Sequence, residues 1–151
     1  MAAWPREFIV LWRALQRCLP KRWRRKSQSR VLIVDDEPAV CSFVARALQQ
    51  EGYATEVAFS PSEALIKFLT HGRFDLLLTD ENMPETRGHE LAARLRQLDP
   101  DIRVLYLTGY SDMLFADRPA LWQREAYVDK PVSVRGLSQA VSLLLSDGSA
   151  E

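Results

Sequence analysis

From residue 30 onward, apolar positions follow two patterns that alternate along the chain. Short runs of consecutive apolar residues predict buried strands, and the longer segments between them repeat apolar residues every three or four positions, as amphipathic helices do. The strand segments are 30–37, 53–59, 74–80, 102–109 and 126–131, and the helix segments are 38–52, 60–72, 88–100 and 132–146. In residues 110–125 the pattern is weaker, and Pro119 predicts two short helical pieces or a late helix start.

This order of elements predicts an α/β fold. The strand segments are apolar throughout, as expected when helices cover both faces of a sheet. Strands that alternate with helices favour a parallel sheet with right-handed crossovers. We therefore expect a five-stranded parallel sheet in the order 2-1-3-4-5, with helices on both faces. Segment 60–72 also predicts a capping box, with Ser60 as N-cap, Pro61 at the first helical position and Glu63 three residues after the cap.

Charge divides the chain into two parts. Residues 1–30 contain nine Arg or Lys and one acid, whereas residues 31–151 contain eleven basic residues and nineteen acids. In the basic part, apolar residues at helical spacing are followed by a basic linker; they are Phe8, Leu11, Trp12, Leu15 and Leu19. We expect a basic amphipathic arm and linker over 1–29, a folded domain over 30–146 and a short tail over 147–151.

Cysteine usage and hydropathy favour a cytoplasmic protein. Cys18 lies in the arm and Cys41 in a predicted helix, so a disulfide framework is not expected. No apolar stretch approaches the roughly 20 residues that cross a bilayer. Arg13 and Arg17 interrupt the apolar core that a signal peptide would need.

Four of the five predicted strands end at side chains that can take part in chemistry, and the second does not. The first ends at Asp35 and Asp36, the third at Asp80, the fourth at Thr108 and the fifth at Lys130. In a parallel sheet of this order, ligands bind beyond the carboxyl ends of the strands, near the point where strand order reverses. We therefore expect these side chains to meet in one crevice.

Such a crevice has the parts that phosphoryl transfer needs. Three carboxylates at close range repel one another, and they would either take up protons or bind a cation. Oxygen ligands suit Mg²⁺, which usually shares its coordination with a phosphate. A carboxylate nucleophile, a metal ion, an ammonium group and a hydroxyl together can carry out this reaction.

Four motifs, VLIVDDEP, LLLTDENMP, LYLTGYSD and AYVDKP, occur in this order along the chain. Their order and separations resemble the receiver domain of two-component response regulators, over about residues 30–146. The resemblance implies the flavodoxin-like receiver fold. It also implies that Asp80 accepts a phosphoryl group from a phosphohistidine on a sensor histidine kinase or phosphotransfer protein.

The resemblance assigns further roles around Asp80. It implies Mg²⁺ binding by Asp35, Asp36, Asp80 and the backbone carbonyl of Asn82, phosphoryl contacts from Thr108 and Lys130, and a switch formed by Thr108 and Tyr127. The family often has a cis peptide bond at the position of Lys130–Pro131. Two regions depart from the family pattern: Thr86 and Arg87 replace an apolar residue and an acid, and residues 111–125 are unlike the usual fourth helix.

The function implied is a phosphorylation-controlled signalling module that catalyses only its own phosphorylation and dephosphorylation. Because only DGSAE follows the last predicted helix, we expect no output domain and signalling through contacts with an unknown protein. One alternative is an intermediate or phosphate sink in a phosphorelay, and another is a scaffold that is never phosphorylated. A third is a Mg-dependent aspartyl-phosphate phosphatase, which Asn82 disfavours because such enzymes need an acid at that position.

The same residues have ordinary structural explanations. Asp35 and Asp36 would serve as helix-cap and turn residues, Asp80 as a turn acid, and Tyr127 as a packed strand aromatic. The four motifs together favour the functional interpretation.

The remaining reactive side chains carry no functional assignment. His71 and His89 lie in or beside predicted helices, and both are expected to face solvent. Cys41 is expected to be a small, partly buried apolar residue.

The arm has four interpretations: a tail without a role, a membrane-surface segment, a protein contact, or a nucleic-acid contact. Trp4, Trp12 and Trp23 among basic residues suit an anionic membrane surface, which residues 4–26 would contact from the cytoplasmic side. No recognised DNA-binding motif is present, so we expect no nucleic-acid partner.

Overall fold

The computed structural model describes residues 7–11, 28–109 and 124–146. The expectations for arm residues 1–6 and 12–27, for residues 110–123 and for the tail 147–151 therefore lie outside the described residues. Residues 7–11 are helical, in keeping with the spacing of apolar residues there. None of the helices in the described ranges is long and apolar enough to cross a membrane.

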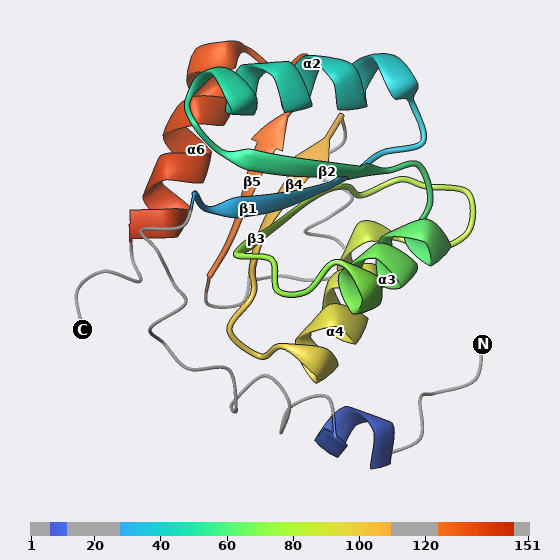
Figure 1. Ribbon diagram of the computed structural model, residues 1–151. Coiled ribbons are helices and arrows are strands. Elements are labelled where there is room, and N and C mark those ends of the chain that lie inside the picture. Colours follow the sequence, from blue (N-terminus) through green and yellow to red (C-terminus); the bar gives the residue numbers. More distant parts are fainter. Residues whose placement is uncertain (1–6, 12–27, 110–123, 147–151) are drawn as a thin grey trace.

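Strands and helices alternate from β1 to β4 in the described residues, and β5 and α6 follow after residues 110–123 (Figure 1). The elements are β1 (Arg30–Val34), α2 (Pro38–Gln50), β2 (Ala54–Ala58), α3 (Pro61–Thr70), β3 (Leu76–Asp80), α4 (Gly88–Leu98), β4 (Arg103–Thr108), β5 (Glu125–Asp129) and α6 (Val134–Ser146). Each predicted strand and helix in these ranges is present, with most ends a few residues inside the predicted segment.

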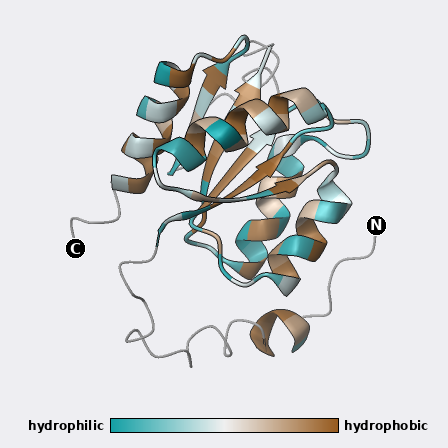
Figure 2. Ribbon diagram, turned by 45° about the horizontal axis from the view of Figure 1, so that its top comes forward, coloured by the Kyte–Doolittle hydropathy of each residue, from teal (hydrophilic) through white to brown (hydrophobic). Residues whose placement is uncertain are grey.

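The sheet has the predicted order, β2-β1-β3-β4-β5, and all four strand pairs are parallel. Helices α2 and α6 lie on one face, and α3 and α4 lie on the other (Figure 1). In Figure 2 the strands are almost continuously hydrophobic, whereas the helices carry hydrophilic residues on their outer sides. This is the arrangement expected for a parallel sheet that is covered on both faces.

Alternate residues of each strand supply two separate core layers. Leu32 and Leu77 belong to the apolar cluster beneath α3 and α4, whereas Ile33 and Leu78 belong to the cluster beneath α2 and α6. Because side chains of a strand alternate between its two faces, the inner positions of the central strands must be mostly apolar, and Thr79 near the end of β3 is a buried polar exception. The core therefore leaves mainly the strand ends free for polar side chains.

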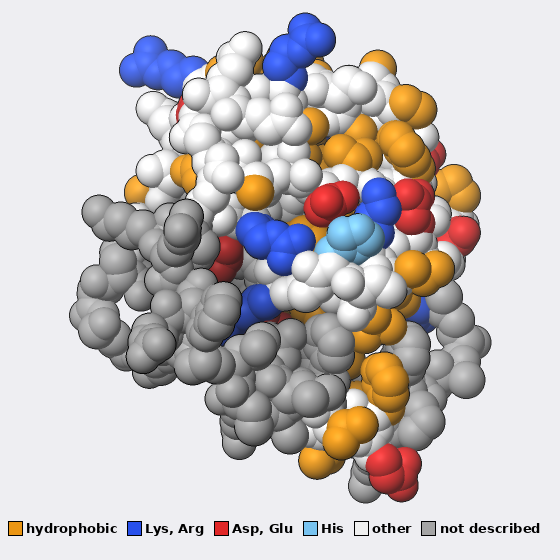
Figure 3. Space-filling view, viewed as in Figure 1, with side chains coloured by type: hydrophobic (Ala, Val, Ile, Leu, Met, Phe, Trp, Pro, Cys, Tyr) orange, Lys and Arg blue, Asp and Glu red, His pale blue; other side chains and the backbone are white. Residues whose placement is uncertain are grey.

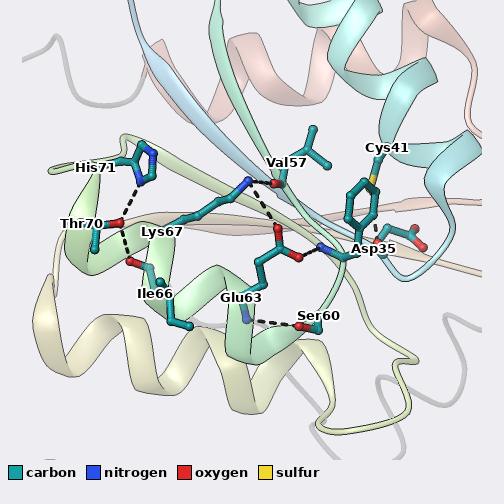
Figure 4. Close-up of polar contacts among 10 residues, drawn as sticks. Asp35, Cys41, Val57, Ser60, Glu63, Ile66, Lys67, Thr70 and His71 are labelled. Atoms are coloured by element: carbon teal, nitrogen blue, oxygen red, sulfur yellow. Dashed lines mark hydrogen bonds and ion pairs between the residues drawn. The ribbon is translucent and has the colours of Figure 1, made fainter.

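Helix α3 begins with the predicted capping box (Figure 4). The Ser60 hydroxyl accepts a hydrogen bond from Glu63 N at 3.1 Å, and Pro61 takes the first helical position. The Glu63 carboxylate in turn accepts a bond from the backbone N–H of Phe59 at 2.9 Å, one residue before the N-cap. Lys67 pairs with the same carboxylate at 3.4 Å. The first two contacts thus hold the turn that joins β2 to α3, and the ion pair within α3 orients the Glu63 carboxylate.

Candidate functional site

The carboxyl ends of β1 and β3 place the predicted acids next to each other. The two strands are neighbours, and Val34 pairs with Thr79, so Asp35 and Asp80 leave the sheet at the same level. The Asp35 Oδ1 atom accepts a hydrogen bond from Glu37 N at 2.9 Å, which fixes the carboxylate in the turn before α2. Glu37, not Asp36, is the N-cap of α2, and it makes no side-chain cap bond.

The carboxylate oxygens of Asp35, Asp36 and Asp80 lie within 4.8 Å of one another, which makes these residues a candidate cation site among the described residues. Asp35 and Asp80 are buried, whereas Asp36 is exposed to solvent. The cluster is therefore open on one side. Three carboxylate groups at this separation fit a hard divalent cation such as Mg²⁺, which uses oxygen ligands and retains several waters.

Lys130 brings a positive charge to the same cluster from the far end of the domain. Its Nζ atom lies 3.1 Å from Asp35 Oδ2 and 3.5 Å from Asp80 Oδ1. Its backbone N–H donates to the Thr108 carbonyl at 2.9 Å, which ties the end of β5 to the end of β4. The peptide bond that follows, Lys130–Pro131, is cis as predicted.

Burial and nearby charges shift the pKa values of Asp80 and Lys130. Burial raises the pKa of Asp80 to about 6; the nearby charge of Asp35 adds to the rise, and Lys130 opposes it. Burial lowers the pKa of the Lys130 ammonium, but its hydrogen bond to Asp35 and the charge of Asp80 outweigh burial and leave that pKa above its ordinary value. Lys130 thus remains a cation beside two acids. A side chain that binds anionic oxygens needs this positive charge.

The other predicted site residues lie around this cluster. Thr108 is the last residue of β4 and is fully buried, next to the strand that carries Asp80. Asn82 follows Asp80 by two residues and is exposed. Tyr127 lies in the middle of β5, with 39% of its surface exposed, so its ring lies at the protein surface.

A small apolar groove borders the cluster on the side of α2. It has a volume of about 270 Å³. Its lining residues are Ala39, Val40, Phe43, Lys130, Pro131 and Val132. Lys130 is therefore shared by the groove and the acidic cluster. Figure 3 shows one face of the molecule, on which charges of both signs lie between scattered hydrophobic side chains.

Cys41 is more deeply buried than expected. It is 1% exposed, and its Sγ atom donates to the Asp35 carbonyl at 3.3 Å, as Figure 4 illustrates. Burial and the charge of Asp35 raise the pKa of the thiol to about 11. The residue supports the backbone of the site and is unsuited to act as a nucleophile.

One expectation about the histidines is wrong. His71 is exposed as predicted, but the His89 side chain is only 21% exposed, and its Nδ1 atom contacts the carboxylate of Glu81. Glu81 is 2% exposed and directly follows Asp80. The pattern of apolar residues carries no signal for this pair, because the two residues belong to a loop and a helix N-terminus that meet only in the folded chain.

Comparisons with known proteins identify the family. A family model described as the response regulator receiver domain matches residues 31–142. The response regulator receiver protein CpdR of Brucella abortus is 32% identical over 120 residues, which cover 77% of this chain and 96% of CpdR. The sensor kinase CckA of the same organism is 36% identical over 116 residues, and the match covers 76% of this chain but 12% of CckA.

Solved structures agree with this result. The response regulator protein TrrA of Thermotoga maritima, in complex with Mg²⁺ and BeF, has a TM-score of 0.68 and 35% sequence identity, and the match covers 78% of this chain and 100% of TrrA. A CheY-like receiver domain protein from Methanospirillum hungatei has a TM-score of 0.70 and 30% identity, over 82% of this chain and 98% of that protein. The strand order, the family model and these relatives show that the chain belongs to the response regulator receiver domain family.

Proposed function

We propose that Asp80 accepts a phosphoryl group from a phosphohistidine of a sensor histidine kinase or phosphotransfer protein, and that this controls a protein contact. The observation that carries the proposal is the convergence of Asp35, Asp36, Asp80 and Lys130 at the carboxyl ends of three strands. In the reaction, the phosphorus–nitrogen bond of the donor breaks as a phosphorus–oxygen bond to Asp80 forms. The reaction needs Asp80 deprotonated and the phosphoryl oxygens held by cationic and hydroxyl groups.

The described residues fit these needs. The carboxylates of Asp35, Asp36 and Asp80 and the carbonyl of Asn82 would hold Mg²⁺, which would neutralise charge on the phosphoryl oxygens when bound. The Lys130 ammonium group, 3.5 Å from Asp80 Oδ1, would bind one of these oxygens. The Thr108 hydroxyl would bind another and would move toward the phosphoryl group as Tyr127 turns inward.

Phosphorylation would add about −1.5 to −2 charge to this site. A two-state shift of Thr108 and Tyr127 would then change the surface of β5 and α6. Tyr127 and Val134 are 39% and 48% exposed on that surface, which supports its use as a protein contact. Catalysis of its own phosphorylation and dephosphorylation would be the only chemistry of this receiver, whose purpose is signalling.

Labelling by acetyl phosphate in the presence of Mg²⁺ tests the proposal. We expect the wild-type protein to gain one phosphoryl group, detected by intact mass, and Asp80→Asn to gain none. Asp101→Asn is a matched control, because Asp101 is an exposed acid before β4 at the opposite end of the sheet. Undiminished labelling of Asp80→Asn would exclude Asp80 as the acceptor, and rapid multiple turnover of phosphate esters would favour a phosphatase.

The apolar groove is a candidate docking surface for the protein that donates the phosphoryl group. A protein donor must bring its phosphohistidine to within bonding distance of Asp80, so it must cover surface next to the cluster. The groove shares Lys130 with the cluster, and the ring of Phe43 at its rim is 42% exposed. We therefore assign the groove to the kinase or phosphotransfer protein.

The arm supports a second contact, with an anionic membrane surface at the cytoplasmic side. In the described helical residues 7–11, Ile9 packs against the domain core, while Phe8, Val10 and Leu11 are 39%, 65% and 63% exposed. Exposed apolar residues next to a basic sequence suit a membrane interface. Flotation with vesicles of anionic lipid should carry the full-length protein, and the double change Val10→Asp and Leu11→Asp should abolish it. Equal flotation of both proteins would exclude this contact.

A further inference from the structure

Glu81, in the loop after β3, has a buried carboxylate that has no role in the proposed phosphoryl transfer. Glu81 lies between Asp80 and Asn82, and its side chain is 2% exposed. A carboxylate that is removed from water is costly unless it is paired and hydrogen-bonded. The contacts of Glu81 therefore show which parts of the fold its side chain and backbone connect.

Both the backbone and the side chain of Glu81 are engaged. Its N–H donates to the Leu107 carbonyl at 3.1 Å, which extends the ladder between β3 and β4 by one residue. Its carbonyl accepts from Gly88 N at 3.0 Å. Its Oε2 atom accepts from His89 N at 3.0 Å, and its Oε1 atom contacts His89 Nδ1.

These contacts fasten the first turn of α4 to the end of β3. Arg87, the N-cap of α4, makes no side-chain cap bond, so the Glu81 carboxylate supplies an acceptor for a free N–H group of the helix. Gly88 lies so close that a Cβ there would clash with the Asp80 carbonyl and lie 3.1 Å from the Cα and Oε2 atoms of Glu81. The loop of residues 82–87 is therefore held at both ends.

Asn82 lies within this held loop, and its backbone carbonyl is the only proposed metal ligand that does not come from a carboxylate. Its position relative to Asp80 depends on the path of the chain between Glu81 and Gly88. We propose that Glu81 and His89 are positioning residues, which hold the Asn82 carbonyl at the metal site. This inference depends on the proposed Mg²⁺-dependent phosphorylation of Asp80.

A positioning role and a purely structural role predict different results. Loss of a residue that orients a metal ligand weakens metal binding, commonly by about tenfold or more. Loss of a helix cap lowers the free energy of unfolding and leaves the metal dependence of the folded protein unchanged. The affinity of the unphosphorylated protein for Mg²⁺, measured by titration calorimetry, separates the two roles. The rate of acetyl-phosphate labelling as a function of Mg²⁺ concentration gives a second, independent value.

For Glu81→Ala and His89→Ala we expect the half-saturating Mg²⁺ concentration to rise about tenfold. The labelling rate at saturating Mg²⁺ should change less than about twofold, because Asp80, Thr108 and Lys130 are untouched. The half-saturating Mg²⁺ concentration of the double variant should be no higher than that of either single variant, because the two residues act through one contact. His89→Asn keeps a side-chain donor near the place of Nδ1 and should restore the wild-type Mg²⁺ dependence.

Glu63→Ala is the matched control, because the Glu63 carboxylate also accepts from a backbone N–H, that of Phe59 just before α3, and the same side chain is removed. We expect its Mg²⁺ dependence to equal that of the wild type. An unchanged half-saturating Mg²⁺ concentration in Glu81→Ala and His89→Ala would overturn the inference, as would an equal shift in Glu63→Ala. The proposed function itself fails if the wild type is not labelled, or if Asp80→Asn is labelled. Both of these results differ from those that would overturn only the inference about Glu81 and His89.

Discussion

The Lys130 ammonium group lies 3.1 Å from Asp35 Oδ2, although the two residues are 95 positions apart in the sequence. Asp35 follows the first strand of the domain and Lys130 follows the last, and β3 and β4 lie between them in the sheet. The same ammonium group is 3.5 Å from Asp80 Oδ1. One cation therefore links the two buried acids of the site, which would otherwise repel each other.

Replacement of this cation should destabilise the protein. In Lys130→Met, Asp35 and Asp80 lose their shared partner, and we expect the free energy of unfolding to fall by about 1–3 kcal/mol, less than for a fully buried pair because Asp80 can take up a proton. Urea unfolding without Mg²⁺ measures this change. Lys67→Met is the control, because Lys67 pairs with the more exposed Glu63 and should lose no more than about 1 kcal/mol. Equal losses in both variants would contradict a special role for Lys130.

The raised pKa of Asp80 predicts a pH dependence of stability. Burial moves this pKa from 3.8 to about 6, so between these values the folded protein holds a proton that the unfolded chain has released. The free energy of unfolding of the metal-free protein should therefore decrease as the pH rises through this interval, by up to about 3 kcal/mol. Asp80→Asn should lack this decrease and be the more stable protein at pH 7. If the free energy of unfolding had the same pH dependence in both proteins, the raised pKa of Asp80 would be refuted.

Phe43 should distinguish a protein donor from a small one. Its ring borders the groove next to Lys130, so Phe43→Ala should slow phosphoryl transfer from the cognate kinase by about tenfold, the effect of losing about 1.4 kcal/mol of contact free energy. Acetyl phosphate needs no such surface, and its labelling rate should be unchanged. Ile66→Ala, at an exposed apolar residue of α3 on the other face of the sheet, is the control for kinase transfer. Equal effects of Phe43→Ala on both donors would exclude the groove as the docking surface.

Gly88 should tolerate no side chain. A Cβ at this position would clash with the Asp80 carbonyl, so Gly88→Ala must move the start of α4 away from β3, at a cost of about 2 kcal/mol in the free energy of unfolding. Gly109→Ala is the control, because a Cβ there would have no described atom within 4 Å. Urea unfolding of both variants is the measurement. A Gly88→Ala protein as stable as Gly109→Ala would show that the loop has room to adjust.

Much of the fold could be predicted because its signals are local. The apolar run at Leu76–Leu78 and the helical spacing of Leu91, Leu95 and Leu98 each depend on a few neighbouring residues. Alternation of such segments restricts the topology to a parallel sheet, because parallel strands need crossover connections. The capping box of α3 is local as well. Its one difference, a bond from Phe59 N to Glu63 in place of one from Ser60 N, is a shift by a single residue.

The candidate site could be predicted in part, for the same reason. A polar residue directly after a buried strand must lie at the end of the sheet, so Asp35, Asp80 and Lys130 could be placed in one region before any distance was known. Their separations could not be predicted, since each depends on strand register and on the turn that follows. The positions of Tyr127 at the surface and of Cys41 beneath Asp35 depend on side-chain packing in the same way.

The sequence by itself thus determined the order of elements, the strand ends that carry the predicted site residues and the family motifs. Only the tertiary structure decided that His89, expected to face solvent, turns toward Glu81, and that Glu81 is buried beside Asp80. The physical reason is that periodicity records which face of an element is apolar, and this information is local. The partner of a buried polar group is chosen by the packing of whole elements, here β3 against α4, and that packing is a property of the complete fold.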